Sequence, residues 1–93
     1  MGLKMDRYRN RIDRIDRKIS RLLSRRLVQV LRIGAEKKKN SIGVSDVMRE
    51  KEVLRNVGSV VEGEQAGRFI QSIYGRIFEA SSRAQEEADW TGK

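Results

Sequence analysis

The N-terminal part of the chain carries an apolar stripe at helical spacing. Its members recur at steps of three and four residues, apart from one longer gap: Tyr8, Ile12, Ile15, Ile19, Leu22, Val30 and Ile33. No proline interrupts the pattern, which is typical of an amphipathic helix. We therefore predict one long helix from Met5 to about Lys39.

Two further apolar stripes predict two further helices. Ser45 is a good N-cap residue, so the second helix is expected to start there. Its apolar stripe consists of Val47, Leu54, Val57 and Val61. The third helix is expected from about Glu64 to Glu87. Its inner face consists of Ala66, Phe69, Ile70, Ile73, Ile77 and Ala84.

The segments between and after these helices have the composition of turns. Residues 40–43 contain an asparagine and a glycine, which suit the left-handed conformations of a helix end, and a loop is expected at 58–63. Residues 89–93 are expected to fray, leaving about 5–88 structured. No strand pattern or internal repeat occurs. The sequence thus predicts a single all-α domain with a long, a short and a medium helix.

Polar residues interrupt all three stripes. Arg26 and Lys37 fall in the first, Glu50 in the second and Ser81 in the third, with Gln85 at its edge. Each residue alone could have a purely structural role, such as an ion pair between Glu50 and Arg26 or a serine hydrogen-bonded to a helix carbonyl. Five polar residues on the apolar faces of three helices would destabilise a core unless a hydrogen-bond network or a ligand satisfies them. We therefore predict a shared polar pocket.

The second helix adds two polar residues to this set. Asp46 lies at the border of its apolar stripe, and Arg49 lies beside it across one turn. Arg26 and Lys37 are about 16 Å apart along the first helix, which leaves room for a compact ligand with two anionic groups. Arg9 is about 25 Å from Arg26 on the same helix. It can reach such a ligand only from a second chain.

The length of the first helix also predicts a second chain. Thirty-five helical residues span about 52 Å, whereas a compact domain of this size is only about 32 Å across. The helix would therefore extend beyond its own domain and leave its apolar stripe in water. We expect a symmetric, intertwined homodimer to cover that stripe.

The composition of the chain excludes several kinds of catalytic and metal site. The net charge is +8, and residues 1–39 hold fourteen Lys/Arg against four Asp/Glu, which suits an anionic partner. The chain has no cysteine and no histidine, so a disulfide, a thiolate metal site and Ser-His-Asp or Cys-His catalysis are excluded. The N-terminus has no apolar signal region and no long apolar run follows. We expect a cytoplasmic protein without membrane partner or metal.

The misplaced polar residues form motifs that resemble the all-helical chorismate mutases over residues 8–86. The motifs are R-x-x-I-D-x-I-D-x-x-I-x-x-L-L-x-x-R from Arg9 to Arg26, I-G-x-x-K ending at Lys37, D-x-x-R-E from Asp46 to Glu50, and I-F-x-x-S-S-x-x-Q ending at Gln85. Each motif alone is weak, but all four occur in order. The second helix departs from the family, which often has proline where this chain has Gly43 and Val47.

The resemblance implies an enzyme that rearranges chorismate to prephenate in aromatic amino acid biosynthesis, as a homodimer without a cofactor. Arg26 and Lys37 would bind the substrate's carboxylate and ether oxygen region, and Arg9 would reach a carboxylate from the partner chain. Gln85 would donate to the ether oxygen opposite Lys37. The remaining implied substrate-binding residues are Asp46, Arg49, Glu50 and Ser81.

Three alternatives remain open on the sequence. An isochorismate pyruvate lyase uses a similar cationic pocket, and sequence separates the two poorly. A basic helical nucleic-acid binder would explain the charge of the first helix but leaves Glu50, Ser81 and Gln85 unexplained, so no nucleic-acid partner is expected. A coiled-coil dimer without a ligand would predict that Arg26→Ala leaves stability unchanged or improved. Activation by a partner enzyme is left undecided by the sequence.

Overall fold

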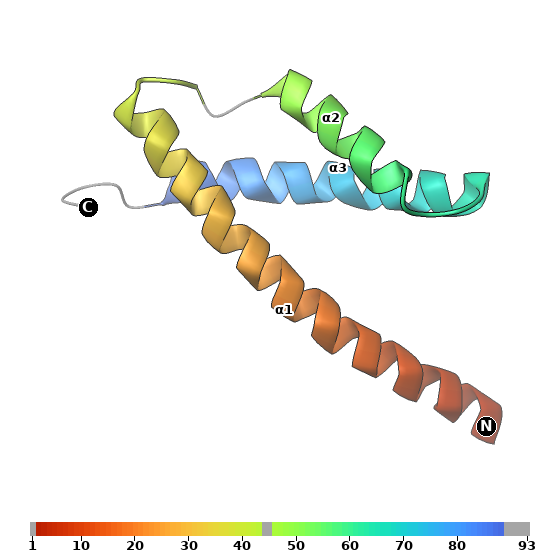
Figure 1. Cartoon of the computed structure of the whole chain (residues 1–93). Coiled ribbons are helices and arrows are strands. Elements are labelled where there is room, and N and C mark those ends of the chain that lie inside the picture. The colour runs from red at the N-terminus through yellow and green to blue at the C-terminus, as the bar shows by residue number, and fades with distance from the viewer. Residues whose placement is uncertain (1, 44–45, 89–93) are drawn as a thin grey trace.

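The computed structural model describes residues 2–43 and 46–88, which form three α-helices (Figure 1). α1 spans Leu3–Lys39, α2 spans Val47–Gly58 and α3 spans Glu64–Glu87. No strand occurs in the described part of the chain, and the predicted all-α fold is confirmed. α1 begins slightly before the predicted Met5, and α3 has the predicted bounds.

α1 is far longer than a compact domain of this size requires. It has 37 residues, and the described molecule measures 55 × 30 × 17 Å with a radius of gyration of 16.9 Å. A compact domain with the same number of residues would have a radius of gyration of about 12 Å. The N-terminal half of α1 extends away from α2 and α3, as Figure 1 shows. The predicted overshoot of this helix is confirmed.

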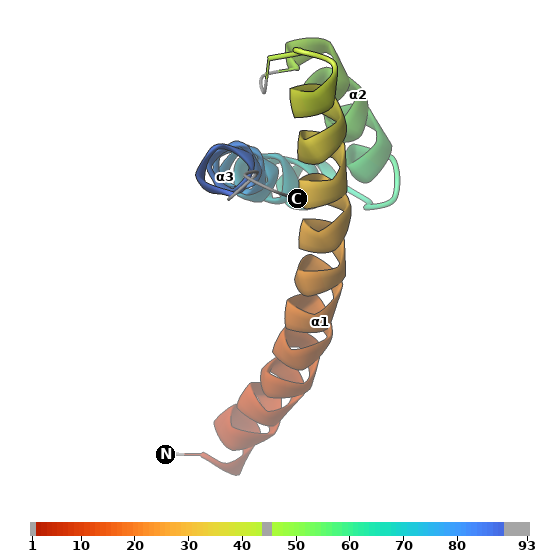
Figure 2. The ribbon, with the colours of Figure 1, turned by 90° about the vertical axis from the view of Figure 1, so that its left-hand side faces the viewer.

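α3 holds the other two helices together. It contacts both α1 and α2, whereas no Cα atom of α1 lies within 8 Å of one in α2 among the described residues. Figure 2, a view along α3, shows α1 and α2 passing on one side of it. The C-terminal half of α1, the start of α2 and the C-terminal half of α3 therefore surround a common space.

A single chain buries almost none of its apolar side chains. Val30 is the one large apolar residue classed as buried in the described part, with 9% of its surface exposed. The predicted stripe of α1 is exposed along its N-terminal half, where Tyr8, Ile12 and Ile15 each keep more than half of their surface in contact with solvent. Contiguous apolar surface of this extent marks an interaction site in a soluble protein. The described part of a single chain therefore has almost no hydrophobic core of its own.

The structure corrects two local predictions. Ser45 lies outside the described residues, and the N-cap of α2 is Asp46, whose carboxylate accepts a hydrogen bond from the Arg49 backbone N–H at 3.0 Å. Asp caps helices as well as Ser and also interacts favourably with the helix dipole. After α1, the residue in the left-handed region is Ser41, with φ 58°, and neither Asn40 nor Gly43 adopts it.

The loop predicted at 58–63 largely agrees with the structure, since α2 ends at Gly58 and Gly63 precedes α3 with φ 93°. The predicted fraying of 89–93 lies outside the described residues. No described helix is long and apolar enough to cross a membrane. The described residues contain no cluster of three or more potential metal ligands.

Candidate active site

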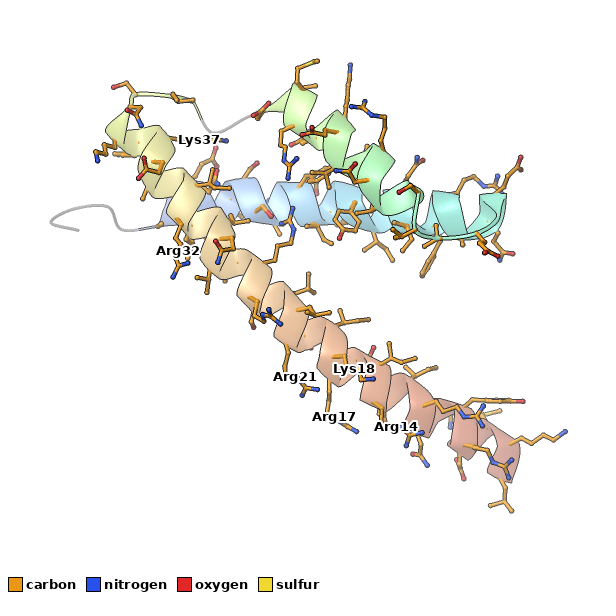
Figure 3. The ribbon with its side chains drawn as sticks, in the orientation of Figure 1. Arg14, Arg17, Lys18, Arg21, Arg32 and Lys37 are labelled. Atoms are coloured by element: carbon orange, nitrogen blue, oxygen red, sulfur yellow. The ribbon has the colours of Figure 1, made fainter. Side chains whose placement is uncertain are left out.

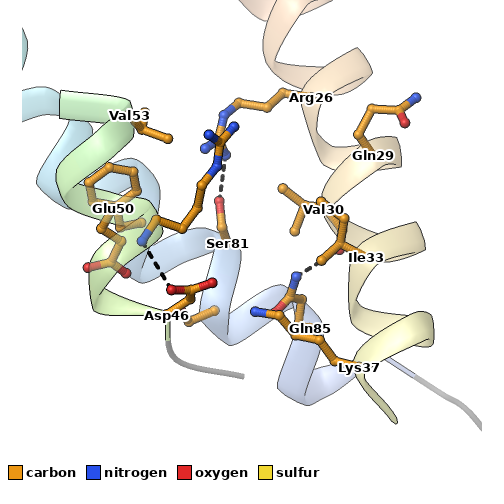
Figure 4. A pocket seen from close by; sticks show the side chains of 13 residues that line it. Arg26, Gln29, Val30, Ile33, Lys37, Asp46, Glu50, Val53, Ser81 and Gln85 are labelled. Atoms are coloured by element: carbon orange, nitrogen blue, oxygen red, sulfur yellow. Dashed lines mark hydrogen bonds between the residues drawn. The ribbon is translucent and has the colours of Figure 1, made fainter. Parts of the chain in front are cut away.

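A cavity of about 440 Å³ lies between the C-terminal half of α1, the start of α2 and the C-terminal half of α3. Figure 4 shows side chains from all three helices converging on it. Seven of the eight predicted site residues line this cavity: Arg26, Lys37, Asp46, Arg49, Glu50, Ser81 and Gln85. The polar residues predicted from three separate stripes are therefore brought together in one pocket.

Arg9 does not line the cavity of its own chain. It lies in the N-terminal part of α1, about 25 Å from Arg26 along the helix axis. Arg9 could therefore reach such a cavity only from a second chain. The structure describes one chain, so the contribution of Arg9 across an interface stays a prediction.

Arg26 links α1 to α3. Its Nη1 donates a hydrogen bond to Ser81 Oγ at 2.8 Å, which Figure 4 marks with a dashed line. No ion pair joins Arg26 to Glu50 in the described part of the chain, so the pair considered from the sequence is absent. A guanidinium carries five N–H donors in a planar fork, and Ser81 accepts a hydrogen bond from only one of them. Ser81 therefore orients Arg26 while most of its donor capacity remains.

Gln85 is the most buried polar residue described, with 7% of its surface exposed. Its Nε2 donates to the backbone carbonyl of Val30 at 2.8 Å. A carbonyl accepts and cannot donate, so this contact requires the amide nitrogen of Gln85 to face α1. The side chain is thus held in one orientation at the wall of the cavity.

The start of α2 contributes three charged residues. Asp46 caps the helix through Arg49, as described above, and Glu50 is half-buried in the first turn. Arg49 Nη1 also lies 2.6 Å from Glu52 Oε1, in a pair whose side chains are 60% and 53% exposed. Exposed pairs of this kind contribute little, about 0–1 kcal/mol. The pair with Glu52 therefore holds the Arg49 side chain only weakly.

Lys37 reaches the cavity from the last turn of α1, where it is half-buried. The three cations Arg26, Lys37 and Arg49 and the two acids Asp46 and Glu50 give the lining a formal charge of +1. A cavity with a cationic excess and several hydrogen-bond donors is suited to a small anion that also carries an acceptor oxygen.

Sequence reasoning missed part of the lining. Phe78 and Ser82 of α3 also line the cavity, and both are half-buried. Residues 78, 81, 82 and 85 follow the spacing i, i+3, i+4, i+7, which places them on one helix face. That spacing was available as a signal. The remaining residues of the lining are the polar Gln29 and the apolar Val30, Ile33 and Val53.

Fold and cavity together define an all-helical protein with a cationic, donor-rich pocket that would suit a small anionic ligand. The family model of chorismate mutase type II matches residues 8–86. The chain therefore belongs to the chorismate mutase type II family, whose members are isomerases acting on chorismate. No curated protein matches the chain.

The family match covers nearly all of the described residues, including every residue that was predicted for the site. It supports chorismate mutase activity and confirms the resemblance drawn from the four motifs. It lends no support to the isochorismate pyruvate lyase or the nucleic-acid binder as the function of this pocket.

Proposed function

We propose that the cavity binds chorismate and accelerates its rearrangement to prephenate by holding the substrate in its reactive form. The observation that carries this proposal is the convergence of seven predicted residues from three helices on one cavity of a chorismate mutase family member. The reaction is pericyclic, so the bonds break and form within the substrate. Catalysis then depends on orientation and on stabilising charge in the transition state.

The cations fix the two carboxylates of the substrate. Arg26, already oriented by Ser81, binds one carboxylate, and Arg9 from the partner chain binds the other. Arg49 holds a carboxylate or shapes the pocket beside it. Adding the partner's arginine raises the formal charge of the lining from +1 to +2, which matches a dianion. Two anchored carboxylates restrict the flexible substrate to few conformations.

Lys37 and Gln85 act on the ether oxygen, which gains negative charge as the C–O bond breaks. Lys37 donates from the end of α1, and Gln85 donates from α3 on the opposite side. The contact of Gln85 with the Val30 carbonyl supports this role, because a donor held in place before the reaction needs no reorganisation during it. Glu50 accepts a hydrogen bond from the substrate hydroxyl, and Asp46 supports the start of α2.

The active protein is an intertwined homodimer with two such sites. The exposed apolar stripe on the N-terminal half of α1 supports this assembly, because a second chain laid along it would bury the stripe. A two-fold arrangement would place the N-terminal part of one α1 near the other chain's cavity, where Arg9 is needed. The dimer would thus supply both the missing core and the missing cation.

Chorismate consumption by the purified protein tests this proposal, with the product identified by chromatography. We expect Lys37→Ala to lower kcat by about a hundred- to a thousandfold, since one preorganised donor to a developing oxyanion contributes about that much. Lys38→Ala is the matched control, because Lys38 is the exposed neighbour and does not line the cavity. Wild-type protein that produces no prephenate would refute the proposed function.

A further inference from the structure

Seven cations form a straight row on α1, which we call the basic stripe: Arg7, Arg11, Arg14, Lys18, Arg21, Arg25 and Arg32. They follow alternating steps of four and three residues, with one gap at Val28. The row is about 38 Å long. At 100° per residue, no Asp or Glu between its ends falls on the same face of the helix.

The basic stripe is separate from the other two functional surfaces. All seven side chains are exposed, and none lines the candidate active site. The row is centred about 105° around the helix from the apolar stripe. Figure 3 shows Arg14, Arg21 and Arg32 on the side of α1 that faces away from α2 and α3. Substrate in the cavity and a second chain on the apolar stripe would both leave the row uncovered.

The protein does not neutralise this row itself. Arg49, Arg68 and Arg76 of α2 and α3 each pair with a glutamate three or four residues away. By contrast, none of the seven forms an ion pair among the described residues. Like charges three and four residues apart repel one another and weaken the helix. An uncompensated row of this kind attracts an external polyanion, whose charges would relieve the repulsion.

The composition of the row selects among polyanions. Protein interfaces are centred on apolar or aromatic anchors, and a membrane-surface helix needs an apolar face beside its cations. Within its length the basic stripe has only one apolar residue, Val28 at its gap, and no aromatic one. The apolar stripe on the neighbouring face of α1 is the surface that the second chain of the proposed dimer would cover. A phosphate backbone requires only cations, and the arginines that make up six of the seven positions bind phosphate through two parallel hydrogen bonds. We propose that the basic stripe binds the phosphate backbone of duplex nucleic acid without reading its sequence.

Two features favour a duplex over a single strand. The row is straight and matches about 11 base pairs at 3.4 Å per pair. It also carries no aromatic side chain on which an unpaired base would stack. Nucleic-acid binding was set aside above because it leaves Glu50, Ser81 and Gln85 unexplained. Those residues lie in the cavity, on another face, so that objection does not apply to the basic stripe.

Fluorescence anisotropy with a labelled duplex of about 20 base pairs, titrated over a range of salt concentrations, tests the proposal. We compare wild type with the triple variant Arg14→Gln, Lys18→Gln, Arg21→Gln. The matched control is Lys51→Gln, Arg55→Gln, Arg83→Gln, which removes the same charge from exposed positions on α2 and α3. Helical content and chorismate mutase activity are measured for each variant, and both are expected to remain at wild-type values.

We expect the stripe variant to bind the duplex about tenfold or more weakly, and the slope of log K against log salt to become shallower by about 2.7. The control should stay within about twofold of wild type, and a single strand of equal length should bind more weakly. If both triple variants lost the same affinity for the duplex, binding would depend on net charge and not on the basic stripe, and the proposal would be overturned. Tighter binding of polyglutamate or of anionic vesicles than of the duplex would also overturn it, in favour of an acidic protein or a membrane surface.

Discussion

Ser82 lies in the candidate site although it was not among the predicted site residues. Its half-buried hydroxyl lines the cavity on the same face as Ser81 and Gln85. It has no hydrogen-bond partner among the described residues, whereas Ser81 accepts from Arg26 and Ser72 donates to the Phe69 carbonyl. A donor without a partner in an anion pocket is available to the ligand.

We predict that Ser82→Ala raises KM for chorismate about tenfold and leaves kcat within about twofold, since a hydrogen bond to a charged group contributes about 1.5–3 kcal/mol. A substitution that weakens binding of the ground state and of the transition state equally raises KM and leaves kcat unchanged. Steady-state kinetics measure both constants, and Ser72→Ala is the control on the same helix. An unchanged KM in Ser82→Ala would show that this hydroxyl does not contact the substrate.

At the residue scale, the sequence predicted which side chains would meet but not the contacts they make. Arg26, Ser81 and Gln85 were identified because they are polar residues at apolar positions. The apolar pattern does not favour Ser81 over Glu50 as the partner of Arg26, since both were predicted to point inward from their helices. The bond from Gln85 to the Val30 carbonyl depends on how closely α1 and α3 approach. Apolar spacing alone does not fix that distance.

At the element scale, the short helix α2 depends on Asp46 in two ways. This residue caps the helix through the Arg49 backbone N–H, and the helix begins immediately after it with Arg49 and Glu50 in the first turns. Loss of the cap would free the first turn, which carries two residues of the candidate site. Stability and activity are therefore expected to fall together when the cap is removed.

We predict that Asp46→Ala lowers the free energy of unfolding by about 1 kcal/mol, whereas Asp46→Asn changes it by only a few tenths, because asparagine caps about as well as aspartate. Urea titration followed by circular dichroism measures both values. Chorismate mutase activity should follow the same order. If Asp46→Asn loses as much activity as Asp46→Ala while keeping its stability, the carboxylate charge itself acts in the site.

The helices themselves were predictable because their apolar periodicity is strong and unbroken. α3 has its predicted bounds, and α1 differs only in starting two residues earlier, at Leu3 instead of Met5. The turns were harder to predict. Ser45 and Asp46 are adjacent and cap equally well, so sequence preference does not choose between them. Ser41 adopts the left-handed conformation although asparagine and glycine stand nearby, which local propensity would not predict.

At the scale of the whole molecule, the exposed apolar stripe on α1 makes assembly the central question. Ile12 keeps 53% of its surface exposed in the single chain and lies in the middle of the N-terminal half of the helix. Asn10, by comparison, lies on the opposite, polar side of α1 and is also exposed. The same substitution at these two positions therefore separates an effect on assembly from a general effect of charge.

We predict that Ile12→Asp raises the dissociation constant of the proposed dimer by about a hundredfold or more, because an unpaired carboxylate at an apolar interface costs several kcal/mol. Asn10→Asp should leave the dimer intact. Sedimentation velocity at several protein concentrations measures the change. Chorismate mutase activity of Ile12→Asp should fall in parallel with the fraction of dimer. Wild-type protein that sediments as a monomer at all concentrations would contradict the assembly.

The proposed sharing of Arg9 between chains can be tested by mixing two inactive variants. Arg9→Ala and Lys37→Ala homodimers each lack one residue in both sites. In a mixed dimer, one site combines the intact Lys37 of one chain with the intact Arg9 of the other, and the second site lacks both residues. Random exchange of subunits makes half of the dimers mixed, so about a quarter of the wild-type activity should return.

This recovery distinguishes the two possible arrangements of Arg9. If Arg9 served the cavity of its own chain, every site in the mixed dimer would lack either Arg9 or Lys37, and mixing would restore nothing. The distance of about 25 Å between Arg9 and Arg26 along α1 argues against that arrangement. Recovery to about a quarter of the wild-type activity would place the arginine across the interface and show that the long α1 both completes the core and supplies the site.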